Sequence, residues 1–196
     1  MTKATATVAA MVAMVTAGAG RPADAASHAE RVVVVHVTDY AQISPSALEA
    51  AEQLAARVYS SVGVQVIWAD DQVKTAQPDG SFNVQVVLLS RAMTTMKCLE
   101  ERIPDSTFGT ATKAGGRAYI FYNRIADHAA HTQTAVSRPL GLVLAHEIGH
   151  LLLPAYSHSR TGIMRAAWDG PMLLVPDFTN EQGAAIRGLL TAVHAN

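Results

Sequence analysis

The residues best suited to chemistry in this chain are His146, Glu147 and His150, which form an H-E-x-x-H segment. The segment lies in an apolar stretch, 139–152, whose spacing predicts a buried helix that Pro154 ends. Residues four apart share one face of a helix, so both imidazoles can bind one metal ion from the same side. Glu147 can then take a proton from a water molecule that the metal activates. This pattern predicts a metal-dependent hydrolase.

Burial of these polar side chains on an apolar helix favours a ligand-binding function. Two unpaired imidazoles and a carboxylate are costly to remove from water, and a bound metal ion would offset that cost. The competing interpretation is a purely structural helix whose polar groups find other protein partners. That interpretation leaves the order of residue types in the segment unexplained.

A second informative stretch follows the predicted helix. It contains His158-Ser159 and then Gly162-Ile163-Met164. With the H-E-x-x-H segment, these residues resemble the metzincin zinc peptidases, and most closely the matrixins. In that family a third histidine completes the zinc site, and a turn that contains methionine lies beneath it.

The resemblance implies a role for each matching residue. His146, His150 and His158 would bind one catalytic zinc ion, Glu147 would be the general base, and Met164 would form the methionine turn. The implied activity is that of a zinc metalloendopeptidase. Its substrate would be a peptide or protein that lies extended along the edge strand of the sheet, for which 108–112 is the candidate segment.

The spacing differs from the family pattern between the second and third histidines. In the pattern H-E-x-x-H-x-x-G-x-x-H, glycine would occupy position 153 and histidine position 156. This chain has Leu153 and Tyr156 there, and His158 follows two residues later. We therefore expect a longer turn after the helix. Four residues can span roughly 13–14 Å, which is enough to return to the metal.

Several alternatives remain open at this point. Glu181 could be the downstream carboxylate ligand of a gluzincin-like hydrolase, or simply an acidic residue in the first turn of the last helix. Tyr156 could assist near the metal or pack in a loop. His128 and His131, beside Asp127, could hold a second ion or lie in a solvated loop. A non-catalytic exported module that binds a metal or a peptide is the alternative outside the enzymes.

Other conspicuous residues have simpler interpretations. Cys98 is the only cysteine, so no internal disulfide can form, and we expect it to be a small buried hydrophobic residue. His36 is expected to be a core histidine with its hydrogen bonds satisfied. Trp68 and Trp168 are expected to be packing residues.

The remaining pattern predicts the elements that position the H-E-x-x-H segment. Together they indicate a metzincin-like single domain of the mixed α/β (α+β) class, with a twisted mixed sheet, a long active-site helix and a C-terminal helix. The expected strands are 32–37, 64–68, 83–89 and a hairpin-like pair 108–112 and 117–122; the expected helices are 45–62, 139–152 and 179–193; 70–80 is a polar turn, 127–137 and 157–176 are irregular, and 91–104 is a short helix or a loop.

The first 25 residues have the features of a signal peptide. Lys3 precedes an uncharged run at 4–19, and Ala23-Asp24-Ala25 offers a cleavage site. The alternative is a buried or membrane-spanning helix. We expect a secreted or periplasmic protein whose catalytic domain is 26–196.

The composition excludes other classes of protein. Of 196 residues, 49% are hydrophobic, which is too many for a disordered chain. The formal net charge of −1 and the lack of a basic block argue against binding to nucleic acid or to an anionic membrane. We expect a monomer that has no stable membrane association.

Overall fold

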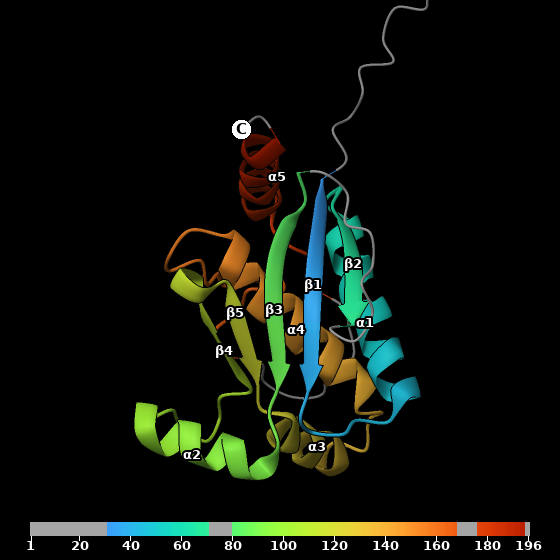
Figure 1. Ribbon diagram of the computed structural model, residues 1–196, viewed down its shortest axis with the longest axis vertical. Helices are drawn as coiled ribbons and strands as arrows, with labels where there is room; N and C mark the ends of the chain where they lie inside the picture. The colour runs from blue at the N-terminus through green and yellow to red at the C-terminus, as the bar shows by residue number, and fades with distance from the viewer. Residues whose placement is uncertain (1–30, 71–79, 168–175, 195–196) are drawn as a thin grey trace, which may run out of the picture.

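The computed structural model describes residues 31–70, 80–167 and 176–194 (Figure 1). The predicted signal peptide, Trp168 and most of the turn predicted at 70–80 lie outside this part of the chain. The elements run in the order β1 (Val32–Asp39), α1 (Pro45–Ser60), β2 (Gln65–Asp70), β3 (Phe82–Leu88), α2 (Arg91–Glu101), β4 (Gly109–Thr112), the 3-10 turn η1 (Lys113–Gly115), β5 (Arg117–Ile120), α3 (Tyr122–His131), α4 (Ser137–Leu152) and α5 (Asn180–His194).

The strands form one five-stranded sheet in the order β2-β1-β3-β5-β4. β1 pairs in parallel with both β2 and β3, and β3 pairs in parallel with β5. β4 is antiparallel to β5 and lies at the edge, with Gly109 opposite Ile120 and Thr112 opposite Arg117. The predicted fold class, a mixed sheet with a long helix and a C-terminal helix, is confirmed.

Helices α1 and α4 lie together on one face of the sheet, behind it in Figure 1. Helix α1 begins at Ser44-Pro45, where proline is favourable because the first helical position needs no N–H partner. Its apolar side faces α4, and the buried Tyr59 hydroxyl donates to the Ala145 carbonyl oxygen at 2.9 Å. Helix α4 is buried along most of its length, so its polar residues are held rigidly.

One of two open segments has the helix that was among its alternatives, and the other differs from the expectation. Within 91–104, residues Arg91–Glu101 form helix α2, whose N-cap Ser90 accepts a hydrogen bond from the Met93 backbone amide. The loop expected at 127–137 is wrong in its first half, because helix α3 extends to His131. Only Ile125 and Ala129 of α3 are buried, so the apolar signal in the sequence is weak.

The minor expectations have mixed outcomes. Trp68 packs against the core as expected. Cys98 is only half-buried rather than buried, because α2 packs loosely and buries only Thr94. His36 is hydrogen-bonded to Asn83, but it is only partly buried and is not a core residue. No helix in the described part of the chain is long and apolar enough to cross a membrane.

Candidate metal centre

Three histidine side chains converge at the C-terminal half of α4. His146 and His150 project from successive turns of the helix, and His158 returns to them from the segment after it. The His150 Nε2 atom lies 3.0 Å from His146 Nε2 and 3.1 Å from His158 Nε2. No other group of three or more His, Cys, Asp or Glu ligand atoms gathers in this way among the described residues.

Neighbouring oxygen atoms orient two of these rings. His146 Nδ1 lies 2.8 Å from the Ile163 carbonyl oxygen, which can only accept, so Nδ1 donates and Nε2 keeps its lone pair. His150 Nδ1 is 3.3 Å from the Ser157 hydroxyl oxygen. Such outer contacts fix the tautomer and orientation of metal-binding histidines.

The three nitrogens fit a catalytic zinc site. Ligands at about 2.0–2.1 Å from a tetrahedral zinc ion lie roughly 3.3–3.4 Å apart. The separations of 3.0 and 3.1 Å are close to that value. Three protein nitrogens also leave the fourth position open, as in hydrolytic zinc enzymes.

Burial favours the neutral form of His146 and His150. The pKa of His146 is lowered to about 4, mainly by burial, with the Ile163 hydrogen bond opposing the shift and the nearby His158 adding to it. The pKa of His150 is also lowered to about 4, first by burial and then by His146, His158 and Lys113. Neutral imidazole is the form that binds a metal, so the His146 and His150 rings are in the metal-binding form at neutral pH.

Glu147 is buried between α4 and the edge strand. Its side chain lines the same cleft as the three histidines and is only 6% exposed. Burial raises the pKa of Glu147 to about 8. A dication at the neighbouring histidines would favour the ionised carboxylate, which is the form that accepts a proton.

Met164 is fully buried, and its side chain lies against α4 at Gly149. A β-carbon on Gly149, within the H-E-x-x-H segment, would come 2.6 Å from the Met164 sulfur. The absence of a side chain at Gly149 therefore permits the close approach of Met164 to α4. That Met164 forms a methionine turn stays a prediction.

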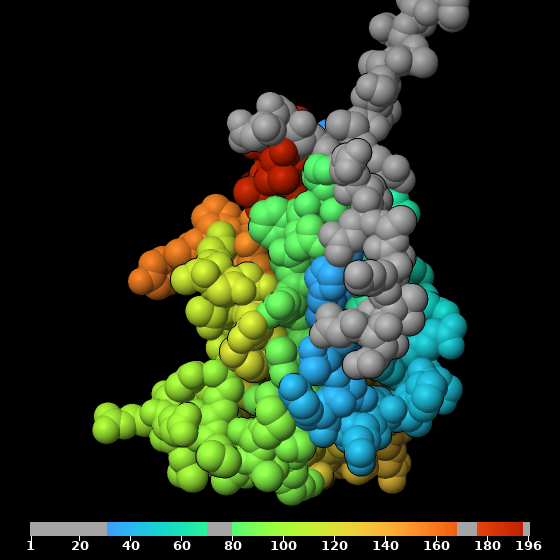
Figure 2. All heavy atoms as spheres, in the orientation of Figure 1, coloured from blue at the N-terminus to red at the C-terminus, as the bar shows by residue number. Residues whose placement is uncertain are grey.

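The open side of the site is a cleft of about 970 Å³. One wall is the edge strand β4 with the segment 105–108 before it, and the other is formed by 154–158 and 165–167. Figure 2 shows the outline of the molecule indented between the orange segment after α4 and the green α2, beside β4. The cleft is open to a ligand along the free edge of β4.

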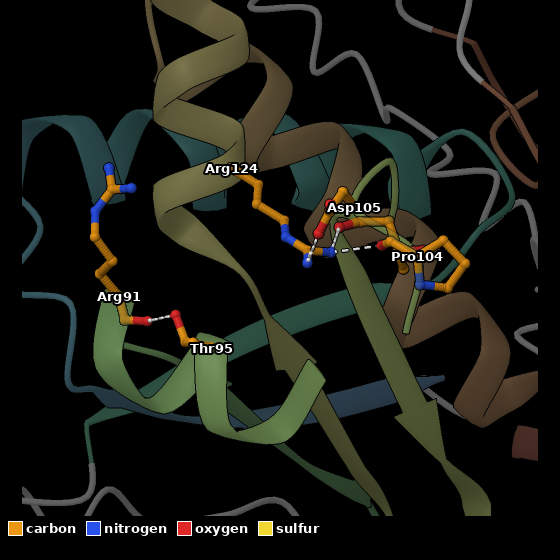
Figure 3. Close-up of polar contacts among 6 residues, drawn as sticks. Arg91, Thr95, Pro104, Asp105 and Arg124 are labelled. Atoms are coloured by element: carbon orange, nitrogen blue, oxygen red, sulfur yellow. Dashed lines mark hydrogen bonds and ion pairs between the residues drawn. The ribbon is translucent and has the colours of Figure 1, made fainter. Parts of the chain in front are cut away.

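A hydrogen-bond network holds the wall before β4. Arg124 of α3 donates to the carbonyl oxygens of Pro104 at 2.7 Å and Thr107 at 2.9 Å. Its guanidinium also pairs with Asp105 at 3.0 Å, as Figure 3 shows. Because the Arg124 side chain is 14% exposed, these bonds tie the loop firmly to α3.

The structure does not bring the alternative ligands to the site. Glu181 is fully exposed in the first turn of α5 and lies outside the histidine cluster. Asp127 pairs with Arg91 instead of forming a metal site with His131. His128 packs against the Phe108 ring at 5.3 Å and lines the cleft, which the sequence did not predict.

Tyr156 lies on the rim of the cleft and does not pack in a loop. Its side chain is completely exposed, and its φ of 62° is in the left-handed region. This residue turns the chain back toward His158 after α4 ends. Leu153 has the extended backbone expected of a residue before proline, so Pro154 does end the helix.

Known structures share this arrangement of elements. Archaemetzincin from Methanopyrus kandleri has a TM-score of 0.53 and 12% sequence identity, over 82% of this chain and 97% of that one. The chain has an archaemetzincin-like fold. A zinc-dependent peptidase from Methanocorpusculum labreanum is also similar, with a TM-score of 0.46 and 13% identity over 80% of this chain and 99% of that one. Archaemetzincin from Archaeoglobus fulgidus has a TM-score of 0.42 and 16% identity over 79% of this chain and 99% of that one.

Sequence comparison adds nothing to this result. No protein-family model matches the chain, and no curated protein sequence does either. The likeness to archaemetzincin from Methanopyrus kandleri supports the expected metzincin-like fold. The expected likeness to matrixins rests on sequence motifs alone.

Proposed function

We propose that this protein is a zinc-dependent endopeptidase of the metzincin type. The observation that carries the proposal is the convergence of three imidazole nitrogens beside a buried carboxylate in an open cleft. His146, His150 and His158 would hold one zinc ion. When bound, that ion would lower the pKa of a water molecule and polarise the substrate carbonyl group.

The chain's own residues then carry the proton. Glu147 takes a proton from the attacking water molecule while the oxygen of that water bonds to the carbonyl carbon of the substrate. The carbon–nitrogen bond breaks, and Glu147 returns the proton to the leaving amine nitrogen. The site keeps Glu147 in place because α4 is rigid and Gly109 leaves room for the carboxylate.

The edge strand supports a peptide or protein as the substrate. Among the described strands, β4 pairs only with β5, so its outer edge could accept an extended peptide by backbone pairing. That pairing would lay the peptide along the cleft wall and across the histidines. We propose that the enzyme acts as a monomer, because the cleft is formed within one chain.

We also propose that the protein is exported and that residues 1–25 are removed. The support is the pattern at the N-terminus of the sequence. Mass spectrometry of the protein recovered outside the cytoplasm would test this. A mature chain that begins at Ala26 is expected, and a retained N-terminus would contradict the proposal.

The activity is tested by incubating the purified chain with a mixed peptide library. Cleavage inside peptides that stops with a chelator and returns with zinc is the expected result. Binding of zinc without any cleavage would instead favour the non-catalytic exported module. Removal of terminal residues only would make the enzyme an exopeptidase.

A further inference from the structure

His158 is the one histidine of the three that no helix holds in place. His158 is exposed and lies in the segment between α4 and α5, outside any helix or strand. The nearest backbone contact in this segment is the bond from the Ser159 amide to the Met164 carbonyl oxygen at 2.8 Å. Because the segment is two residues longer than the metzincin pattern, something else must hold it near α4.

Gln182, from the first turn of α5, contacts both sides of His158. Its amide nitrogen donates to the Ser157 carbonyl oxygen at 3.0 Å and to the Ser159 hydroxyl oxygen at 3.1 Å. The Gln182 side chain is nearly buried, at 9% exposure. These bonds link the C-terminal helix to the residues that flank the expected third ligand.

Gln182 also has a second, separable role. Its side-chain oxygen accepts a hydrogen bond from the backbone N–H of Thr179 at 3.1 Å. In return, the Thr179 hydroxyl oxygen accepts from the backbone N–H of Gln182 at 3.3 Å. This is the capping box that the sequence contains at the start of α5. Glutamate serves a capping box as well as glutamine does, so the cap needs only the oxygen. The side-chain nitrogen of Gln182 takes no part in the cap and donates only to the segment around His158.

The same contact reaches a second ligand indirectly. Ser157, whose carbonyl oxygen Gln182 binds, places its hydroxyl oxygen 3.3 Å from His150 Nδ1. A displacement of Ser157 would therefore loosen the orientation of the His150 ring as well as the position of His158. One amide group from α5 thus acts on two of the three histidines.

We propose that Gln182 is a positioning residue for the metal centre, which holds His158 against α4 through the backbone of Ser157 and the side chain of Ser159. The inference rests on the proposed zinc site. Outer-shell contacts of zinc ligands are typically worth about 10–100-fold in metal affinity. We expect a loss in that range when the Gln182 amide nitrogen is removed.

The decisive variant is Gln182→Glu, which keeps the capping oxygen and removes the donor. Zinc affinity is measured at pH 8 by competition with a chromogenic chelator, and the cobalt(II) form is compared by its visible absorption. We expect an affinity loss of about 10–100-fold and a weaker cobalt spectrum of higher coordination number. Gln182→Met, which cannot donate in any protonation state, should show the same loss.

Thr179→Ala is the matched control for the helix cap. It removes the hydroxyl that caps α5 and leaves the Gln182 amide nitrogen intact, so it should lower the melting temperature but change zinc affinity by less than about twofold. Far-ultraviolet circular dichroism verifies that each variant folds. If Gln182→Glu binds zinc as tightly as the parent protein, the inference is wrong.

A double-mutant cycle separates this inference from the proposed function. In a His158→Ala background, Gln182→Glu should cause a clearly smaller affinity loss than in the parent protein, because only the indirect effect on His150 through Ser157 remains. An undiminished loss would show that Gln182 does not act through His158 and would overturn the inference. A parent protein whose zinc affinity does not depend on His146 or His150 would refute the zinc site itself.

Discussion

The side chain of Glu147 lies directly against the backbone of Gly109 on the edge strand. A β-carbon at position 109 would come 2.7 Å from Glu147 Cγ and 2.9 Å from both Cδ and Oε1. Gly109 does not have a positive φ, so its backbone would accept any residue. Glycine is required here because the Glu147 side chain occupies the space that a side chain at position 109 would fill.

Gly109→Ala should therefore displace Glu147 and leave the histidines in place. A misplacement of about 1 Å can cost about 10²-fold in rate, so we expect kcat to fall by roughly that factor. Zinc affinity should change by less than about threefold. Gly115→Ala is the control, because a β-carbon there meets nothing within 4 Å. Equal losses in the two variants would contradict the assignment.

Glu147→Gln tests the proton transfer itself. The amide has nearly the same shape but cannot accept a proton, so hydrolysis should fall by about 10²–10⁴-fold. Zinc binding and folding should be retained. The measurement is peptide cleavage together with the zinc content of the purified variant. Turnover equal to that of the parent protein would exclude Glu147 as the base.

His158→Ala and Glu181→Ala compare the two candidates for the third ligand. Loss of a direct ligand should reduce zinc affinity by more than the roughly 100-fold that outer-shell changes produce. Glu181 is fully exposed and outside the cluster, so its removal should leave zinc affinity unchanged. Chelator competition gives both values. The opposite pattern would favour the gluzincin-like site.

Glu52 on α1 should make stability depend on pH away from the metal site. Burial, and then repulsion by Glu49, raises the pKa of Glu52 from 4.5 to about 7. The folded state therefore holds this proton more tightly, and stability is lost as the pH rises from about 4.5 to 7. The loss is at most about 1 kcal/mol, because solvent screens a partly exposed carboxylate.

Glu52→Gln should remove that dependence. The variant should be more stable than the parent protein at pH 8 and equally stable near pH 4, as measured by urea unfolding in the presence of a chelator. Glu49→Gln should recover only part of the difference, since repulsion is the smaller cause. A constant difference at both pH values would show that the carboxylate does not titrate as described.

Elements with a strong local signal were predictable from the sequence. Helix α1 follows from Ser44-Pro45 and a regular apolar face, and α4 follows from a continuous apolar run ended by Pro154. The antiparallel β4-β5 pair also forms where two short segments flank a glycine turn. Helix α3 was missed because only two of its residues are buried.

The grouping of His146 and His150 was predictable because the H-E-x-x-H motif places both on one helix face, and the family resemblance added His158. That they bind zinc stays a prediction. The roles of Gly109 and Gln182 were not predictable, because each depends on a contact between residues far apart in the chain. Thr179 and Gln182 form a capping box, a local pattern that sequence spacing can indicate. The spacing of Thr179 and Gln182 could not show that the side-chain nitrogen of Gln182 binds the segment around His158.

The contact between Gln182 and Ser157 has a consequence for biosynthesis. All three histidines leave the ribosome before α5 does, but the amide that holds His158 belongs to α5. A nascent chain that has not yet released its last helix therefore lacks the contacts that hold His158 near α4. If His158 binds zinc as proposed, the metal centre would be completed only after α5 has folded.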